Sequence, residues 1–63
     1  MKRYTNYKIE IAFEWYKDRR MVEYMAMAEG VEQAKEAALK KFWGDRQEYH
    51  NLRIHHITIT EYN

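Results

Sequence analysis

Cysteine, proline and serine are all missing from this chain of 63 residues, and glycine occurs only twice. Without cysteine, neither a disulfide nor a thiolate zinc site can form. Without serine as well, the commonest nucleophiles of covalent catalysis are absent, and no pair of carboxylates stands out from an ordinary charged surface. We therefore expect a protein that is not an enzyme and needs no cofactor.

An excess of charge of one sign is also missing. Eleven basic and ten acidic residues give a net charge of +1, so no global field attracts a polyanion. No apolar run reaches the length of a signal peptide or a membrane span, which predicts a soluble, cytoplasmic protein without membrane contact. Residues 1–63 form one small domain, whose limited core makes dense packing or oligomerisation necessary for stability.

The clearest pattern that is present lies in residues 7–15, Y-K-I-E-I-A-F-E-W. Large apolar residues occupy every odd position, and polar or small residues occupy every even position. Strict alternation over nine residues predicts a β-strand with one buried face. No other segment has five large apolar side chains on one face, so we expect this strand to be the centre of the fold.

A second alternating run, residues 20–28, predicts a β-hairpin with the first strand. The apolar faces of the two strands coincide only if the loop has an even number of residues, either Lys17-Asp18 or the four residues 16–19. In this register Phe13 lies opposite Val22 and Ile11 lies opposite Tyr24 on the buried face.

Residues 31–43 predict an α-helix, with Gly30 as its N-cap and Gly44 as the C′ residue that ends it. Glu32 in the first turn and Lys40 and Lys41 in the last turn suit the helix dipole. The apolar stripe at helical spacing consists of Val31, Ala34, Ala38 and Phe42.

The last predicted strand, residues 52–62, changes phase within its length. Leu52 and Ile54 are even-numbered, whereas Ile57 and Ile59 are odd-numbered. Either a β-bulge at His55-His56 restores the phase, or the strand begins only at His55. The bulge is the favoured interpretation.

These elements predict an α+β fold of order β-β-α-β, with a three-stranded antiparallel sheet of order 2-1-3 and the helix on one face. The order resembles that of the archaeal ribosomal protein LX family, which also has a hairpin, an alanine-containing helix and a final isoleucine-rich strand; the resemblance implies the element order alone. The predicted core is Tyr7, Ile9, Ile11, Phe13, Val22, Tyr24, Ala26, Val31, Ala34, Ala38, Phe42, Ile57 and Ile59.

A basic and aromatic pole is the first candidate site. The topology gathers the hairpin tip, the helix C-terminus and the following loop, and cations beside aromatic rings suit phosphates and bases. The helix dipole and three nearby carboxylates oppose this use. We expect a non-catalytic module that binds nucleic acid or a phosphorylated nucleotide, with these ligand-binding residues: Arg19, Arg20, Lys41, Trp43, Arg46 and Tyr49.

The face of the sheet without a helix is the second candidate. Several adjoining apolar residues there suggest a covered surface, and methionine suits adaptable contacts. The alternative function is therefore a small inhibitor or adaptor that binds a protein, as phage accessory proteins do. The same face or the edge of the second strand is expected to form a homodimer, and the interface residues are Ala12, Met21, Met25 and Met27.

Three histidines, His50, His55 and His56, form an unusual local cluster. Neighbouring residues of a strand point to opposite faces, so His55 and His56 converge on one ligand only if a bulge rotates one of them. We expect no metal site.

Overall fold

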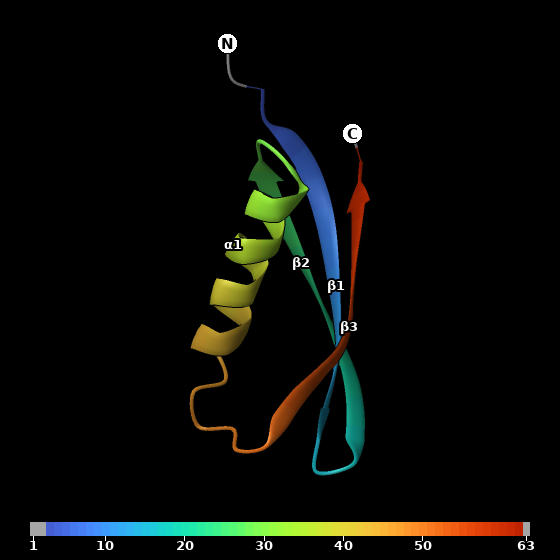
Figure 1. Cartoon of the computed structure of the whole chain (residues 1–63), viewed down its shortest axis with the longest axis vertical. Helices are drawn as coiled ribbons and strands as arrows, with labels where there is room; N and C mark the ends of the chain where they lie inside the picture. The colour runs from blue at the N-terminus through green and yellow to red at the C-terminus, as the bar shows by residue number, and fades with distance from the viewer. Residues whose placement is uncertain (1–2, 63) are drawn as a thin grey trace.

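The computed structural model describes residues 3–62. It contains β1 (Thr5–Trp15), β2 (Asp18–Ala28), α1 (Val31–Gly44) and β3 (Leu52–Glu61). The strands form an antiparallel sheet of order β2-β1-β3, and α1 lies on one side of it (Figure 1). This is the predicted α+β fold, with β1 as the central strand.

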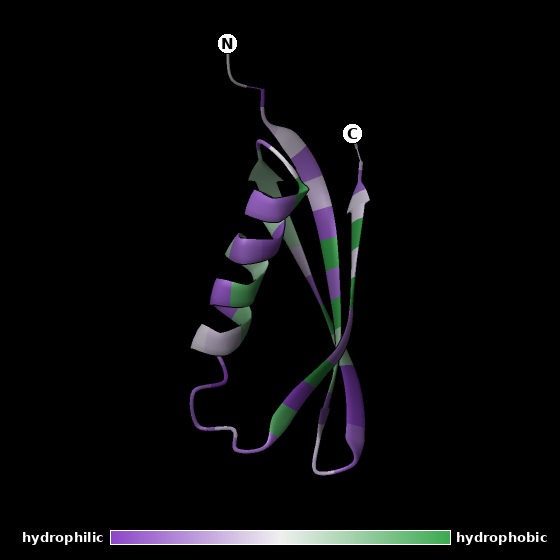
Figure 2. Ribbon diagram, in the orientation of Figure 1, coloured by the Kyte–Doolittle hydropathy of each residue, from purple (hydrophilic) through white to green (hydrophobic). Residues whose placement is uncertain are grey.

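The core lies between β1 and α1. Tyr7, Ile9, Ile11 and Phe13 of β1 are buried, as the alternation predicts. From the helix and β2, the buried partners are Ala34, Ala38, Phe42 and Ala28. The other predicted core residues of the strands are partly buried and pack against this cluster: Val22, Tyr24, Ala26, Ile57 and Ile59. Figure 2 shows the alternation of hydrophobic and hydrophilic positions along β1 and β3.

The β1–β2 turn has two residues, Tyr16 and Lys17, with φ angles of 51° and 69°. The even loop length is confirmed, but the predicted loop position is wrong by one residue and the register by two. Ile11 lies opposite Val22, not Tyr24. A shift of two residues keeps every side chain on its face, so the assignment of faces is unaffected.

Lys17→Gly is expected to raise the free energy of unfolding by about 0.5–1 kcal/mol. A left-handed conformation costs a residue with a Cβ roughly 1–2 kcal/mol, and this exceeds the extra backbone entropy that glycine loses on folding. Urea unfolding followed by circular dichroism measures the change. Lys40→Gly on the exposed side of α1 is the control and should cost about 1 kcal/mol. An unchanged or lower midpoint for Lys17→Gly contradicts strain in the turn.

The two ends of α1 differ from the prediction. Gly30 is the N-cap as expected, but Gly44 is the last helical residue and Asp45 is the C-cap, whose N–H donates to the Lys41 carbonyl at 3.0 Å. Val31 is 51% exposed and does not belong to the core. Side chains on a helix tilt toward its N-terminus, so the side chain of the first residue points beyond the packed region.

The small residues of α1 decide which part of the sheet it covers. Ala34 and Ala38 are fully buried and allow a close approach to the sheet. The helix packs against β2 and β1 and makes far fewer contacts with β3. The apolar side chains of β3 that face the helix side are therefore only partly buried: Leu52, Ile54, Ile57 and Ile59.

The predicted bulge in β3 is confirmed. Ala12 pairs with His56 and Phe13 pairs with Ile54, so His55 is the extra residue. The strand begins at Leu52, and the bulge brings both of its halves into phase with the core.

Candidate functional site

The face of the sheet opposite α1 is called the open face, because no other element of residues 3–62 lies on it. The register places the even-numbered residues of β1 and the odd-numbered residues of β2 there. Its side chains are Asn6, Lys8, Glu10, Ala12 and Glu14 of β1, Arg19, Met21, Glu23, Met25 and Met27 of β2, and Arg53, His55, His56, Thr58 and Thr60 of β3.

Three methionines give the open face its apolar character. Met21, Met25 and Met27 are 64%, 45% and 67% exposed, and all three belong to β2. Ala12 lies opposite Met21, so the four predicted interface residues share one face. Adjoining exposed apolar residues of this kind are typical of contact surfaces, and the flexible thioether adapts to the shape of a partner.

Two glutamates lie at the centre of the open face. Glu10 is directly opposite Glu23, an arrangement that destabilises a sheet when both carboxylates are charged. The Lys8 Nζ is 3.7 Å from the Glu23 Oε1. Within residues 3–62, Glu10 has no ion-pair partner. Among the described residues, the acidic group at the centre of this face therefore has no compensating cation.

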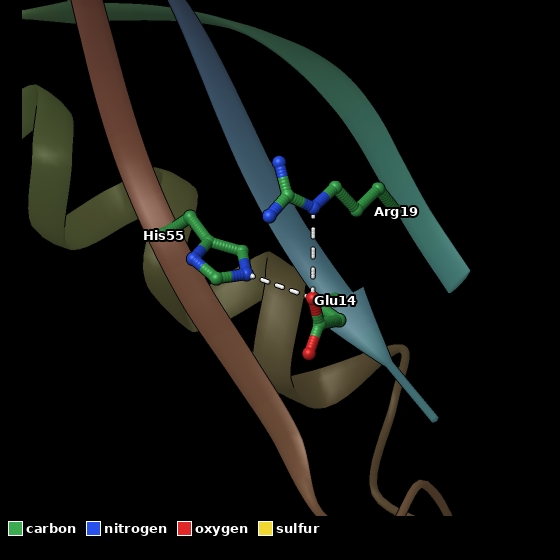
Figure 3. Close-up of polar contacts among 3 residues, drawn as sticks. All are labelled: Glu14, Arg19 and His55. Atoms are coloured by element: carbon green, nitrogen blue, oxygen red, sulfur yellow. Dashed lines mark hydrogen bonds and ion pairs between the residues drawn. The ribbon is translucent and has the colours of Figure 1, made fainter. Parts of the chain in front are cut away.

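Near the C-terminal end of β1, on the same face, Glu14 lies between two basic side chains, Arg19 and His55 (Figure 3). The Glu14 Oε1 is 3.6 Å from the Arg19 Nε and 3.3 Å from the His55 Nε2. Arg19, a predicted phosphate contact, therefore lies on the open face beside a carboxylate. This cluster is also a consequence of the bulge, which turns His55 toward Glu14.

Both histidines of β3 lie on the open face, since His56 is paired with Ala12 there. His50 lies apart in the loop before β3, where its carbonyl oxygen accepts a hydrogen bond from the Trp15 Nε1 at 2.8 Å. Across the described part of the chain, no group of three or more histidine, aspartate or glutamate side chains is arranged to hold a metal ion.

The other two predicted arginines have partners inside the molecule. The Nε and Nη2 of Arg20 are each 2.8 Å from the Asp18 Oδ2. The Arg46 guanidinium lies 4.5 Å and 5.0 Å from the ring centroids of Phe42 and Phe13. Its Nη1 donates to the Tyr24 hydroxyl at 3.1 Å and to the Phe42 carbonyl at 3.3 Å. Arg46 thus closes one end of the core.

The remaining predicted ligands lie at the exposed end of α1 and in the loop. Lys41 is exposed, and Trp43 is 44% exposed with its ring against the edge of Phe42. Tyr49 is 39% exposed and packs on Trp15 at a centroid distance of 4.6 Å. Because Trp43 and Tyr49 pack on different rings, the structure does not join them into one stacking platform.

The predicted topology gathers Trp15, Tyr16 and Tyr49 at this pole, but the sequence did not predict their aromatic row, in which Trp15 contacts Tyr16 at 5.1 Å on one side and Tyr49 on the other. The aromatic residues at the hairpin tip and in the loop before β3 were the signal in the sequence. The contact between Trp15 and Tyr49 could not be predicted from them, because it joins distant segments and depends on the path of that loop. Beside this row, an open hollow is lined by Gly44, Asp45, Gln47, Glu48 and Tyr49. Its two carboxylates disfavour an anionic phosphate.

The fold and these surfaces define a small β-β-α-β domain with one open sheet face. Comparison with models of known protein families, with curated proteins and with solved structures finds no match. Within the described residues, no helix has the length and apolar character needed to cross a membrane.

Proposed function

We propose that this chain is a small adaptor or inhibitor that acts by binding another protein through the open face. The observation that carries the proposal is the row of exposed methionines on β2, on a face that no other element of residues 3–62 covers. Met25 and Met27 lie at successive positions of this face and Met21 lies beyond Glu23, so three of the five side chains that β2 presents there are apolar.

The charges of the open face favour a particular kind of partner segment. Glu10 lies among the methionines without an ion pair in residues 3–62, next to Glu23. An unpaired carboxylate is costly to bury, and an arginine or lysine from the partner compensates for it. The expected partner surface therefore combines apolar side chains with at least one cation placed over Glu10.

Met25→Glu is expected to weaken binding of the partner by roughly tenfold or more, because burial of one methionine contributes about 1.5–3 kcal/mol. The tagged chain is used to capture proteins from an extract of the source organism after nuclease treatment, and the bound proteins are quantified by mass spectrometry. Glu10→Lys should also weaken the capture of the same protein.

Val31→Glu is the matched control. Val31 is 51% exposed but lies on α1, on the other side of the sheet, so the same apolar-to-acid change leaves the open face intact. A protein retained by the wild type and by Val31→Glu, and lost from Met25→Glu, supports the proposal. Equal capture by both variants contradicts it.

Binding of nucleic acid or a phosphorylated nucleotide is the second candidate, and the aromatic row at the hairpin tip favours it. Tyr16 is 62% exposed beside Trp15, and Lys17 follows in the turn. In the same series of experiments, oligonucleotides and nucleotides are titrated while tryptophan fluorescence is recorded. A signal that weakens with added salt supports this function, and no signal at low salt removes it.

A further inference from the structure

The outer edge of β3 is the second notable surface of the sheet. β3 pairs with β1 on one side, and no strand of residues 3–62 pairs with it on the other. Proline and lysine, two residues that commonly block edge pairing, are both absent from Leu52–Glu61. The strand is ten residues long, which is ample for pairing with another strand.

The backbone groups on this edge can be assigned from one hydrogen bond. The Tyr62 N–H donates to the Asn6 carbonyl at 2.9 Å, so it points toward β1. Backbone groups alternate in direction along an antiparallel strand. The N–H and C=O groups of Thr58 and Thr60 therefore also point toward β1, and those of Ile57, Ile59 and Glu61 point outward.

Burial of the side chains of β3 would also stabilise pairing with another strand. Ile57 and Ile59 face the helix side, but α1 packs on β1 and β2 and leaves them only partly buried. A neighbouring strand that places isoleucines beside them covers the outer flanks of these side chains. Cross-strand pairs of β-branched residues stabilise sheets.

We propose that a second copy of this chain pairs with β3 antiparallel, about a two-fold axis through Thr58 and perpendicular to the sheet. Several symmetric registers bring the outward-pointing backbone groups of the two β3 strands opposite each other. In the proposed register, Ile57 of each copy lies opposite Ile59 of the other copy. Ile57 and Ile59 then form hydrogen-bonded pairs, and the two Thr58 side chains face each other. The result is a continuous six-stranded sheet with both helices on one face.

The like charges of β3 do not oppose one another in this register. The strand carries Arg53, His55 and His56 near its beginning and Glu61 at its end. Antiparallel pairing places the basic end of one copy beside the C-terminal end of the other, so the basic side chains of the two copies do not meet across the axis, and Glu61, which pairs with Tyr7, faces the helix side. The two-fold axis leaves the open face uncovered, so this dimer is independent of the proposed function.

The edge of β2 is a poorer match for a second copy. Helix α1 packs on β2, so the helix side of that strand already has a cover. Symmetric pairing about the middle of β2 places Glu23 directly against Glu23 of the second copy, and like charges in direct opposition destabilise a sheet. The homodimer expected from the sequence is therefore assigned to β3.

Disulfide trapping tests the register. Because the chain has no native cysteine, any disulfide that forms must join the introduced residues. Thr58→Cys places two thiols in a non-hydrogen-bonded pair, whose Cα separation of about 4.5 Å suits a disulfide. Thr60→Cys is the matched control on the same strand and face, where the two thiols lie about 13 Å apart along the strand. Under a glutathione redox buffer, Thr58→Cys should give at least about tenfold more cross-linked dimer than Thr60→Cys.

Sedimentation provides the second measurement. The wild type should sediment as a dimer at micromolar concentration, and Thr58→Lys should sediment as a folded monomer, since two lysines then face each other across the axis. Met25→Lys, a comparable change on β2, should remain a dimer. A monomeric wild type, a dimeric Thr58→Lys protein, a monomeric Met25→Lys protein, or preferential cross-linking of Thr60→Cys would overturn the proposed pairing.

Discussion

Replacing Phe42 with alanine is expected to lower the free energy of unfolding by roughly 3–5 kcal/mol. Phe42 is fully buried, and its ring meets Phe13 edge-on at a centroid distance of 5.1 Å. The Arg46 guanidinium lies over the same ring, so the substitution also removes the surface on which this cation rests. A domain of 63 residues has little stability in reserve, and we expect the variant to be largely unfolded at room temperature.

Urea unfolding monitored by circular dichroism measures this loss. Trp43→Ala is the matched control, because Trp43 is the next residue of α1 and is 44% exposed. Its removal should cost about 1 kcal/mol or less. If the two substitutions have similar effects, Phe42 is not the residue that joins the end of the helix to the sheet.

The second large effect is expected at Ile11, where alanine should cost roughly 2–5 kcal/mol. Ile11 is fully buried at the middle of the central strand and is paired with Val22 on one side and Ile57 on the other. Loss of its side chain therefore leaves a cavity with neighbours from all three strands. The midpoint of thermal unfolding and the urea midpoint should both fall.

Two further variants calibrate the result at Ile11. Ile11→Val removes one methylene and should cost about 0.5–1.5 kcal/mol. Ile59→Ala removes the same side chain from the partly buried edge strand, so it should cost less than Ile11→Ala. A near-neutral Ile11→Ala protein would show that the face of β1 assigned to the core does not stabilise the domain.

The alternation of β1 was sufficient to predict which face of each strand is buried, because this depends only on whether a position is odd or even. It was not sufficient for the register. The hairpin turns at Tyr16-Lys17 with two left-handed residues, a conformation that the sequence usually marks with asparagine or glycine. The bulge was predictable because it is visible in the sequence: the phase change between Ile54 and Ile57 requires an extra residue in β3.

The candidate surfaces were predicted with different success. The methionine face followed from strand alternation, and the structure places Ala12, Met21, Met25 and Met27 together as expected. The individual partners of the basic side chains depend on geometry that the sequence does not reveal. Arg46 shows this most clearly: its position in a polar loop suggested a solvent-exposed ligand, whereas it packs over two core rings.

The extra residue in β3 also determines how this strand can change in length. Leu52 and Ile54 precede the histidine pair, Ile57 and Ile59 follow it, and all four face the helix side. Loss of one residue at the histidine pair leaves a regular alternation, so the inward residues stay inward. Loss of Arg53 or Thr58 instead breaks the alternation and places Leu52 or Ile59, respectively, on the open face. Single-residue deletions in this strand are therefore compatible with the core at the histidine pair and incompatible with it on either side.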